Sequence, residues 1–211
     1  MNVISLLAQK GGVGKTTLSI HLAVQAHLEG KKAALVDIDP QGSLSTWSLR
    51  REQQRGAEQP TVLQAEPDRL EEVLSLCRDH SFDYVFVDTL PRVETSAAVA
   101  TRLSDIAVIP TGPSARDIEA IGPSVELAQS LETTAVIVVN RGRPGSSVNA
   151  QALTVLEDYG VPVCQFPIMN RAIFQDSDID GGTAMEHEPK GKASMEIELV
   201  WRWIENKLAK G

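Results

Sequence analysis

The sequence predicts an α/β fold, in which a mostly parallel, twisted sheet carries helices on both faces. Two observations support this. Short apolar runs alternate with stretches of helical spacing along most of the chain. The runs are apolar at successive positions rather than at every second one, which is typical of strands covered on both faces. A glycine-rich stretch after the first run, LLAQKGGVGKTTLSIHL at 6–22, is a third sign of this fold class.

The elements follow from these patterns in chain order. Strands are expected at 2–8, 32–39, 61–65, 84–89, 106–111, 134–140 and 161–167. Helices are expected at 16–30, 68–80, 94–103, 115–131, 147–159 and 194–210. The polar stretch 40–60 is assigned no helix, and the most loop-like stretches are 50–60, 141–147 and 176–192.

The two terminal helices illustrate the reasoning. In the first, Leu18, Leu22 and Ala26 recur at helical spacing and Gly30 is a stop signal. The last helix carries its apolar residues on one face, namely Ile197, Val200, Trp201, Ile204 and Leu208.

Composition narrows the class of protein. The 211 residues, 42% hydrophobic and 23% charged, suit one globular domain over 1–211. No apolar run reaches about 18 residues, so no transmembrane helix is expected. The start lacks a basic leader and a cleavage site, which argues against a signal peptide. Cys77 and Cys164 have no partner spacing and the four histidines are scattered, which indicates a cytoplasmic protein with free thiols and no His/Cys metal site.

The glycine-rich stretch has the order strand, glycines, helix that a phosphate-binding loop requires. Backbone N–H groups from Gly11 to Thr17 can surround phosphate oxygens, and the helix presents its positive end to the same anion. Lys15 can neutralise phosphate charge and the Thr16 hydroxyl can ligate Mg²⁺. The opening glycine of the usual pattern is replaced by Gln9, and an additional lysine, Lys10, follows it.

Three aspartates end predicted strands. Asp37 and Asp39 follow one strand and Asp88 ends another. Ligands of open parallel sheets bind at the carboxyl ends of the strands. The three carboxylates therefore suit a hydrated Mg²⁺ and an attacking water, although each one alone could be a helix or turn cap.

The segments KGGVGKTT, VDIDPQGS and VDTLP, in this order and spacing, resemble the ParA/MinD family of deviant Walker A ATPases, which have a P-loop NTPase fold. The resemblance is specific up to about Gly112 and looser through VIVVNR, FPIMNRAIFQDSDIDGG and the last helix. It implies that Lys10 reaches across a nucleotide-sandwich homodimer to the partner's phosphates. A second positive charge there stabilises the transition state, as an arginine finger does.

The resemblance also assigns roles within the site. Lys10, Lys15 and Asp39 would be catalytic, with Asp39 orienting water, and Thr16 and Asp37 would hold Mg²⁺, the latter through water. Asp88 would be the Walker B carboxylate. Asn140 and Arg141 would lie beside the adenine, which the loop after Phe166 closes over. The implied nucleotide contacts are Gly11, Gly12, Val13, Gly14, Lys15, Thr16, Thr17, Asp88, Asn140, Arg141 and Pro167.

One departure concerns the loop after Asp88. Many relatives have two prolines there, whereas this chain has Thr89, Leu90 and Pro91. That loop senses the nucleotide state in the family, so the response to a partner protein is left open.

Other branches of the family fit less well. The iron-protein branch needs cluster-ligating cysteines, but Cys77 and Cys164 fall within a helix and a strand. MinD proteins end in a basic amphipathic membrane helix, whereas Glu196, Glu198 and Glu205 interrupt the last helix here and favour a core-packing role without membrane binding. Long ParA proteins carry an N-terminal DNA-reading domain, and this chain begins at the first strand.

The function favoured by the sequence is an ATP-dependent partition ATPase of the short plasmid type. ATP and Mg²⁺ would drive dimerisation, and the dimer would bind double-stranded DNA without sequence preference and associate with the nucleoid. A ParB-like or other cargo adaptor would stimulate slow hydrolysis. Positioning of a protein cargo, such as a chemotaxis cluster or microcompartment, and a non-hydrolysing scaffold remain alternatives.

DNA binding is the least expected property, because the net charge is −8. The candidate DNA contacts are Lys190, Lys192, Arg202 and Lys207, late in the chain. A solvated helix surface is the alternative explanation for these cations.

Overall fold

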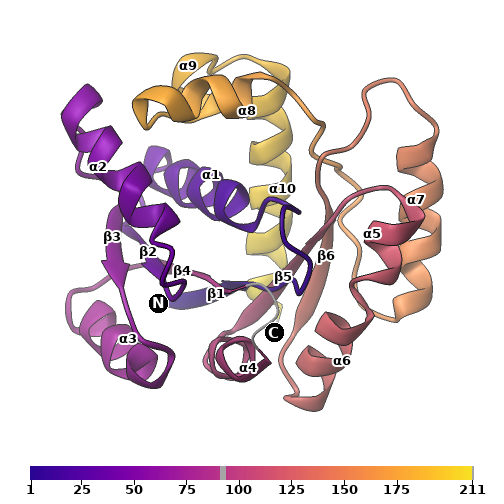
Figure 1. Ribbon diagram of the computed structural model, residues 1–211, viewed down its shortest axis with the longest axis horizontal. Helices are drawn as coiled ribbons and strands as arrows, with labels where there is room; N and C mark the ends of the chain where they lie inside the picture. The colour runs from indigo at the N-terminus through magenta and orange to yellow at the C-terminus, as the bar shows by residue number, and fades with distance from the viewer. Residues whose placement is uncertain (91–93, 211) are drawn as a thin grey trace.

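The structure is a computed structural model that describes residues 1–90 and 94–210. Six parallel strands form one sheet in the order β3-β2-β4-β1-β5-β6 (Figure 1). The strands are β1 (Asn2–Leu6), β2 (Ala33–Asp37), β3 (Thr61–Gln64), β4 (Tyr84–Asp88), β5 (Ile106–Thr111) and β6 (Ala135–Val139). The predicted parallel α/β fold is confirmed.

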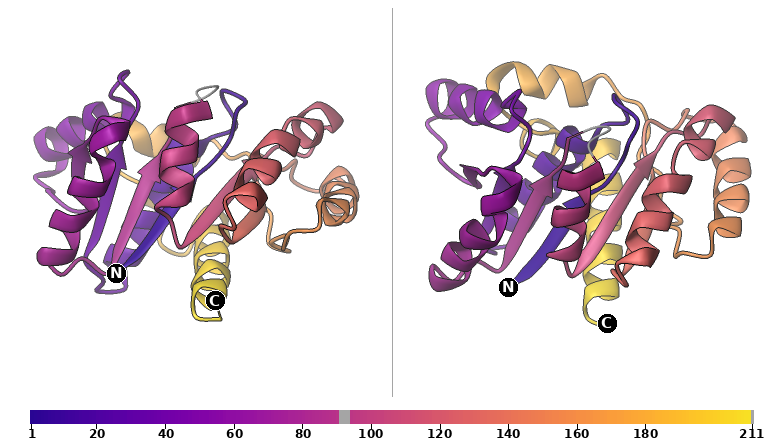
Figure 2. Two further views of the ribbon diagram at one scale, coloured as in Figure 1. Left: turned by 90° about the horizontal axis from the view of Figure 1, so that it is seen from below. Right: turned by 60° about the horizontal axis from the view of Figure 1, so that its bottom comes forward.

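Helices cover both faces of the sheet. They are α1 (Lys15–Leu28), α2 (Ser43–Arg55), α3 (Leu70–Asp79), α4 (Glu94–Arg102), α5 (Ala115–Glu119), α6 (Gly122–Ser130), α7 (Val148–Leu156), α8 (Ile173–Asp176), α9 (Ala184–His187) and α10 (Lys192–Leu208). Short 3₁₀ turns add η1 (Pro67–Arg69), η2 (Glu157–Tyr159) and η3 (Ser177–Asp180). Helices α1 and α10 pack on one face, and α3, α4 and α6 on the other (Figure 2).

Two predicted elements differ from the structure. Segment 161–167 is not a strand: it forms one isolated bridge, Ile137 to Val163, beside β6. Pro162 and Pro167 lack the N–H groups that a ladder needs. The predicted helix 115–131 is divided into α5 and α6, because Pro123 in the first turn of α6 cannot bond back to the preceding turn.

The loop predictions are partly wrong. Helix α2 occupies much of the stretch that was assigned no helix and covers the first half of the 50–60 loop. The sequence did contain a helical pattern here, since Leu44, Trp47 and Arg51 recur at helical spacing and form one buried face. Within 176–192 the chain forms η3 and α9, whereas 141–147 contains no helix or strand, as predicted.

The last helix packs into the core. The side chains of Ile197, Val200, Trp201 and Ile204 are at most 1% exposed, and Trp201 Nε1 donates a hydrogen bond to Glu29. Leu208 is partly buried against the same cluster. Among the described residues, none of the helices has the length and apolar character that crossing a bilayer requires.

Three arginines fasten α2 to the segment after α8. Arg51 is 3% exposed and donates to both carboxylate oxygens of Glu186. Arg50 binds Asp178 through two hydrogen bonds, and Arg55 pairs with Asp180. The backbone approach is close as well: a Cβ on Gly181 would overlap the backbone nitrogen of Arg51. We call residues 178–186 with these arginines the α2 clasp.

His21 joins α1 to α9. Its Nδ1 lies 2.7 Å from the Thr17 carbonyl oxygen and its Nε2 accepts the Ala184 N–H, so the ring is neutral with the proton on Nδ1. The ring is 3% exposed and meets Phe174 edge-on. Burial lowers the pKa of His21 from 6.5 to about 4.

This shift predicts acid sensitivity. As the pH falls from about 6.5 towards 4, the unfolded chain takes up a proton at His21 that the folded chain does not, so stability decreases. Relative to His21→Gln, the free energy of unfolding of the native chain should drop by about 2–3 kcal/mol between about pH 7.5 and 4.5. Urea unfolding of both proteins at several pH values measures this. Parallel pH profiles would contradict it, because all other titrating groups are shared.

Candidate nucleotide-binding site

The glycine loop joins β1 to α1 at the carboxyl edge of the sheet. Gly12 and Gly14 have positive φ angles of 79° and 90°, which favour glycine. Gly14 has a second constraint, since a Cβ there would overlap Nδ2 of Asn140. At Gly11 a Cβ would meet nothing within 4 Å, so the chain's own packing leaves this backbone open.

The start of α1 is built to receive an anion. No side chain caps its N-terminus, and Gly14 occupies the N-cap position. The first N–H groups of a helix have no partner within the helix, and the macrodipole places partial positive charge there. A phosphate at this point would accept hydrogen bonds from these N–H groups and interact favourably with the positive end of the helix dipole.

Lys15 is the cation inside this loop. Its side chain is largely buried, and Nζ donates a hydrogen bond of 3.2 Å to the Ala8 carbonyl. Burial lowers the pKa of Lys15, and the nearby Asp88 and Asp39 only partly oppose this effect. The ammonium therefore lacks a full set of anionic partners, which phosphate oxygens would supply.

Asp88 lies opposite Asp37 in the sheet register and contacts the phosphate loop. Thr16 Oγ1 donates to Asp88 Oδ2, while the other oxygen, Oδ1, is buried and has no hydrogen-bond partner within residues 1–90 and 94–210. Burial raises the pKa of Asp88 to about 7, despite the opposing effects of Thr16 and Lys15. A buried carboxylate oxygen without a partner needs a donor, an ordered water or a cation.

The other two aspartates differ from each other. Asp37 is 2% exposed and accepts backbone N–H groups of Asp39 and Leu44, each at 3.0 Å. Burial raises its pKa. Asp37 thus anchors the start of α2, a capping role that sequence reasoning had treated only as the alternative. Asp39 is half-buried and its carboxylate accepts the Gln41 N–H.

Magnesium fits this edge of the sheet. The Thr16 hydroxyl, the unpartnered Asp88 oxygen and the Asp37 carboxylate are hard oxygen donors, which Mg²⁺ prefers. No group of three or more His, Cys, Asp and Glu side chains within 1–90 and 94–210 is arranged to hold a metal alone. The ion would therefore take most of its ligands from phosphate and water, as Mg²⁺ commonly does.

Lys10 has a partner within its own chain. Its Nζ lies 2.6 Å from Oδ1 of Asp117, in the first turn of α5. Burial raises the pKa of Asp117, but hydrogen bonds from Lys10 and Ser114 outweigh burial and bring it below its usual value. Asp117 was missed in the sequence, where Ser114-x-x-Asp117 reads only as a helix cap; Ser114 does cap α5.

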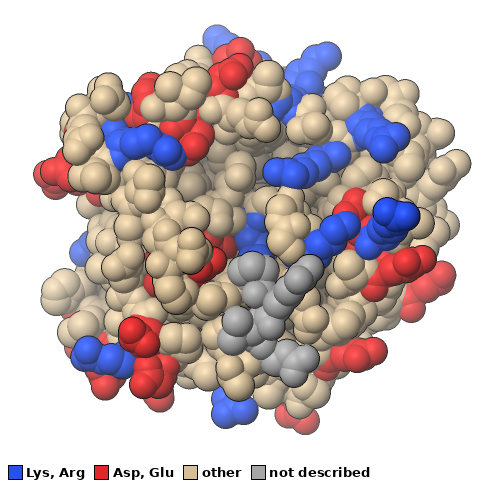
Figure 3. Space-filling model, in the orientation of Figure 1, with Lys and Arg blue, Asp and Glu red and all other residues tan. Residues whose placement is uncertain are grey.

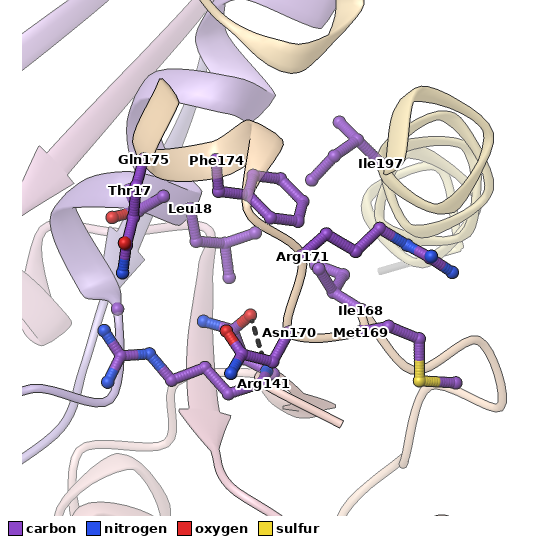
Figure 4. A pocket seen from close by; sticks show the side chains of 12 residues that line it. Thr17, Leu18, Arg141, Ile168, Met169, Asn170, Arg171, Phe174, Gln175 and Ile197 are labelled. Atoms are coloured by element: carbon purple, nitrogen blue, oxygen red, sulfur yellow. Dashed lines mark hydrogen bonds between the residues drawn. The ribbon is translucent and has the colours of Figure 1, made fainter. Parts of the chain in front are cut away.

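A pocket beside the loop contains the two residues that were expected to lie beside the adenine. Asn140 and Arg141 line it together with Ile168, Met169 and Asn170, and Phe174 closes one side (Figure 4). Asn140 Nδ2 donates to the Val13 carbonyl, and its Oδ1 accepts the Arg141 N–H. Pro167, the residue expected here, precedes the lining residues and is not one of them.

Glu196 of α10 holds one wall of this pocket and was not recognised in the sequence. It accepts the Met169 N–H at 3.0 Å and forms an ion pair with Arg171. The segment that lines the pocket is thereby fixed to the last helix. Glu196 and this segment are 25–27 residues apart, and no motif connects them.

The remaining predicted residues lie elsewhere. Arg202 pairs with Glu198, and Lys207 lies over the Trp203 ring. Lys192 begins α10, about 15 Å along the helix from Arg202, so the four candidate cations do not form one cluster. In the loop after Asp88, Thr89 is buried and donates to the Leu6 carbonyl, whereas Pro91 lies outside the described residues.

Comparisons with known proteins agree with this geometry. The family model of the CobQ/CobB/MinD/ParA nucleotide binding domain matches residues 4–183. Maintenance of carboxysome distribution protein A from Gloeobacter kilaueensis is 30% identical over 211 residues, with 98% of this chain and 93% of the relative covered. The protein of the same name from Halothiobacillus neapolitanus is 27% identical, with 88% and 87% covered.

Solved structures share the fold. The septum site-determining protein MinD from Pyrococcus horikoshii, complexed with Mg-ADP, superimposes with a TM-score of 0.78. Its sequence is 18% identical, and 96% of this chain and 95% of that chain are covered. The chain belongs to the CobQ/CobB/MinD/ParA family of nucleotide-binding domains, as its resemblance to ParA/MinD ATPases predicted.

Proposed function

We propose that this protein is an ATPase that binds Mg-ATP, dimerises through its nucleotide face and uses the cycle to position a cargo. The observation that carries the proposal is a buried cation and a buried carboxylate at the phosphate loop, each without enough partners of opposite charge. Lys15 and Asp88 both have pKa values shifted towards the neutral form. A nucleotide triphosphate with its metal supplies the missing negative and positive charge at the same place.

Each residue has a defined task in this scheme. Lys15 and the backbone of Gly11 to Thr17 hold the phosphates, with the base beside Asn140 and Arg141. Thr16 and, through water, Asp37 hold Mg²⁺, which neutralises charge on the phosphates when bound. Asp39, which is half-buried, orients the water. Lys10 leaves Asp117 and contacts the phosphates of the partner copy.

The proposed cargo is a protein assembly. Two nearly full-length relatives carry the name maintenance of carboxysome distribution protein A. Their similarity favours the protein-cargo alternative over plasmid or chromosome partition. A cargo adaptor would stimulate hydrolysis in either case. An ATP hydrolysis assay, with and without proteins that co-purify with the ATP-bound dimer, tests the proposal; absence of turnover in both conditions would favour the non-catalytic scaffold.

Nucleotide binding should depend on Lys15. Lys15→Ala removes the buried counter-charge, and we expect Mg-ATP affinity to fall by about 2–4 kcal/mol, or roughly 30- to 1,000-fold. Calorimetry measures the affinity. Lys31→Ala, an exposed lysine at the other end of α1, is the matched control. Near-normal affinity of Lys15→Ala would place the nucleotide elsewhere.

Lys10 should act between copies. Lys10→Ala should bind ADP as a monomer with near-normal affinity, but lose at least about a hundredfold in hydrolysis and dimerise poorly with ATP. Asp117→Asn removes the Lys10–Asp117 ion pair while keeping the lysine. If Lys10 served only this ion pair, Asp117→Asn would reproduce every defect of Lys10→Ala, and the role in trans would be rejected.

DNA binding should require ATP and occur at the start of α10. With about 4–6 phosphates neutralised per dimer, log K should fall with log salt at a slope of roughly −4 to −5. The Lys190→Ala/Lys192→Ala variant should bind more weakly than Arg202→Ala, because Arg202 is already paired with Glu198. Gel shifts with unrelated duplexes, over a salt series and with ATP or ADP, measure both effects. Equal binding with ADP and ATP would argue against nucleoid association in the ATP state.

A further inference from the structure

The pocket that contains Asn140 and Arg141 is bounded on one side by residues 168–171. We call it the base pocket and residues 168–171 its wall. Ile197 of α10, which is 1% exposed, also lines the pocket. The Arg171 side chain extends from the wall towards α10 (Figure 4). The last helix therefore borders the space in which the base is expected.

Charge on this face of the molecule does not distinguish one base from another. Lys and Arg side chains gather around the hollow near the centre of the face and to its right (Figure 3). They attract the phosphates of every nucleotide alike. Discrimination between bases requires hydrogen-bonding groups that are held at fixed positions.

The wall contains three such groups on its main chain. Within residues 1–90 and 94–210, the carbonyls of Met169 and Asn170 and the N–H of Arg171 form no hydrogen bond. These acceptors and this donor match the Watson–Crick edge of adenine, which donates from N6 and accepts at N1. Guanine accepts at O6 and donates from N1, so in the same pose each wall group would meet a group of its own kind.

Main-chain hydrogen bonds hold the wall on the side of β6. The Ile168 N–H donates to the Val139 carbonyl at 2.9 Å. Gly142 donates to the Ile168 carbonyl at 2.9 Å and accepts the Asn170 N–H at 2.7 Å. These bonds fix Ile168 and Asn170, and they leave the N–H of Met169 to be bound from the side of α10.

Glu196 binds the wall from that side. Its Oε2 accepts the Met169 N–H at 3.0 Å and Arg171 Nε at 3.2 Å, and its Oε1 accepts Arg171 Nη2 at 2.5 Å. The side chains of Glu196 and Arg171 are only 17% and 23% exposed, so water competes little for these bonds. One carboxylate thus holds both residues that flank Asn170.

We propose that Glu196 is a positioning residue for the base: it keeps the carbonyl and N–H groups of the wall in place and thereby sets the preference for adenine over guanine. The inference rests on the proposed nucleotide binding and deepens it. Glu196 is not among the residues that line the pocket, so it acts through Met169 and Arg171.

Three substitutions separate the position of this side chain from its charge. Glu196→Gln keeps the length and an oxygen acceptor for the Met169 N–H, but removes the charge. Glu196→Asp keeps the charge, but its side chain is one methylene shorter and does not reach both Met169 and Arg171. Glu196→Ala removes both properties. The matched control is Glu198→Ala, on the same helix, because Glu198 is 41% exposed and pairs with Arg202.

Calorimetry with Mg-ADP, Mg-GDP and Mg-pyrophosphate measures the effect, since pyrophosphate occupies the phosphate loop without a base. The native protein should bind Mg-ADP at least about tenfold more tightly than Mg-GDP. In Glu196→Ala, the affinity for Mg-ADP should fall about tenfold and approach that for Mg-GDP, while the affinity for Mg-pyrophosphate stays unchanged. Glu196→Gln should keep most of the preference for ADP, Glu196→Asp should lose more of it, and Glu198→Ala should behave as the native protein.

An unchanged preference in Glu196→Ala would overturn the inference, as would equal binding of Mg-ADP and Mg-GDP by the native protein. Equal losses for Mg-ADP and Mg-pyrophosphate would also overturn it, because they indicate general damage to the site. If Glu196→Ala does not fold, the other two variants decide: retention of the preference by Glu196→Asp and its loss in Glu196→Gln would mean that only the charge matters. No binding of Mg-ADP or Mg-pyrophosphate by the native protein would refute the proposed nucleotide binding itself, which the preceding outcomes leave standing.

Discussion

Buried charge at the carboxyl edge of the parallel sheet is the constraint on which the site depends. The register places Asp37 beside Asp88, and the loop after β1 brings Lys15 and Thr16 against them. Burial shifts the pKa of Lys15 down and those of the aspartates up, so each group lacks partners that would keep it charged. Such an arrangement is costly in a chain without a ligand and favourable once phosphate and metal complete it.

The α2 clasp connects the metal side of this site to the base side. Asp37 accepts the N–H of Leu44 at the start of α2, and Arg51 in the same helix is bound by Glu186. The segment that ends at Glu186 continues directly from the wall of the base pocket.

Local sequence patterns predicted most of the fold and the phosphate side of the site. Apolar runs and the glycine loop identified six strands and Lys15, because strand burial and phosphate binding each leave a short-range signal. The patterns did not predict contacts between residues that lie far apart in the chain. Helix α2 was missed although its buried face recurs locally, and only its partners about 130 residues away leave no local signal. Asp117 and Glu196 act on residues 107 and 27 positions distant. Proline chemistry, visible at Pro162, should have excluded the seventh strand.

Phosphate and magnesium together should complete the buried charges, and thermal unfolding tests this most directly. The native chain is heated alone, with Mg²⁺, with ATP plus a chelator, and with Mg-ATP. At about 100 times its dissociation constant, Mg-ATP should add about 2.7 kcal/mol of stability and raise Tm by about 5–10 °C. ATP without metal should give a smaller shift and Mg²⁺ alone almost none. An unchanged Tm with saturating Mg-ATP, or an equal shift with Mg²⁺ alone, would contradict the account.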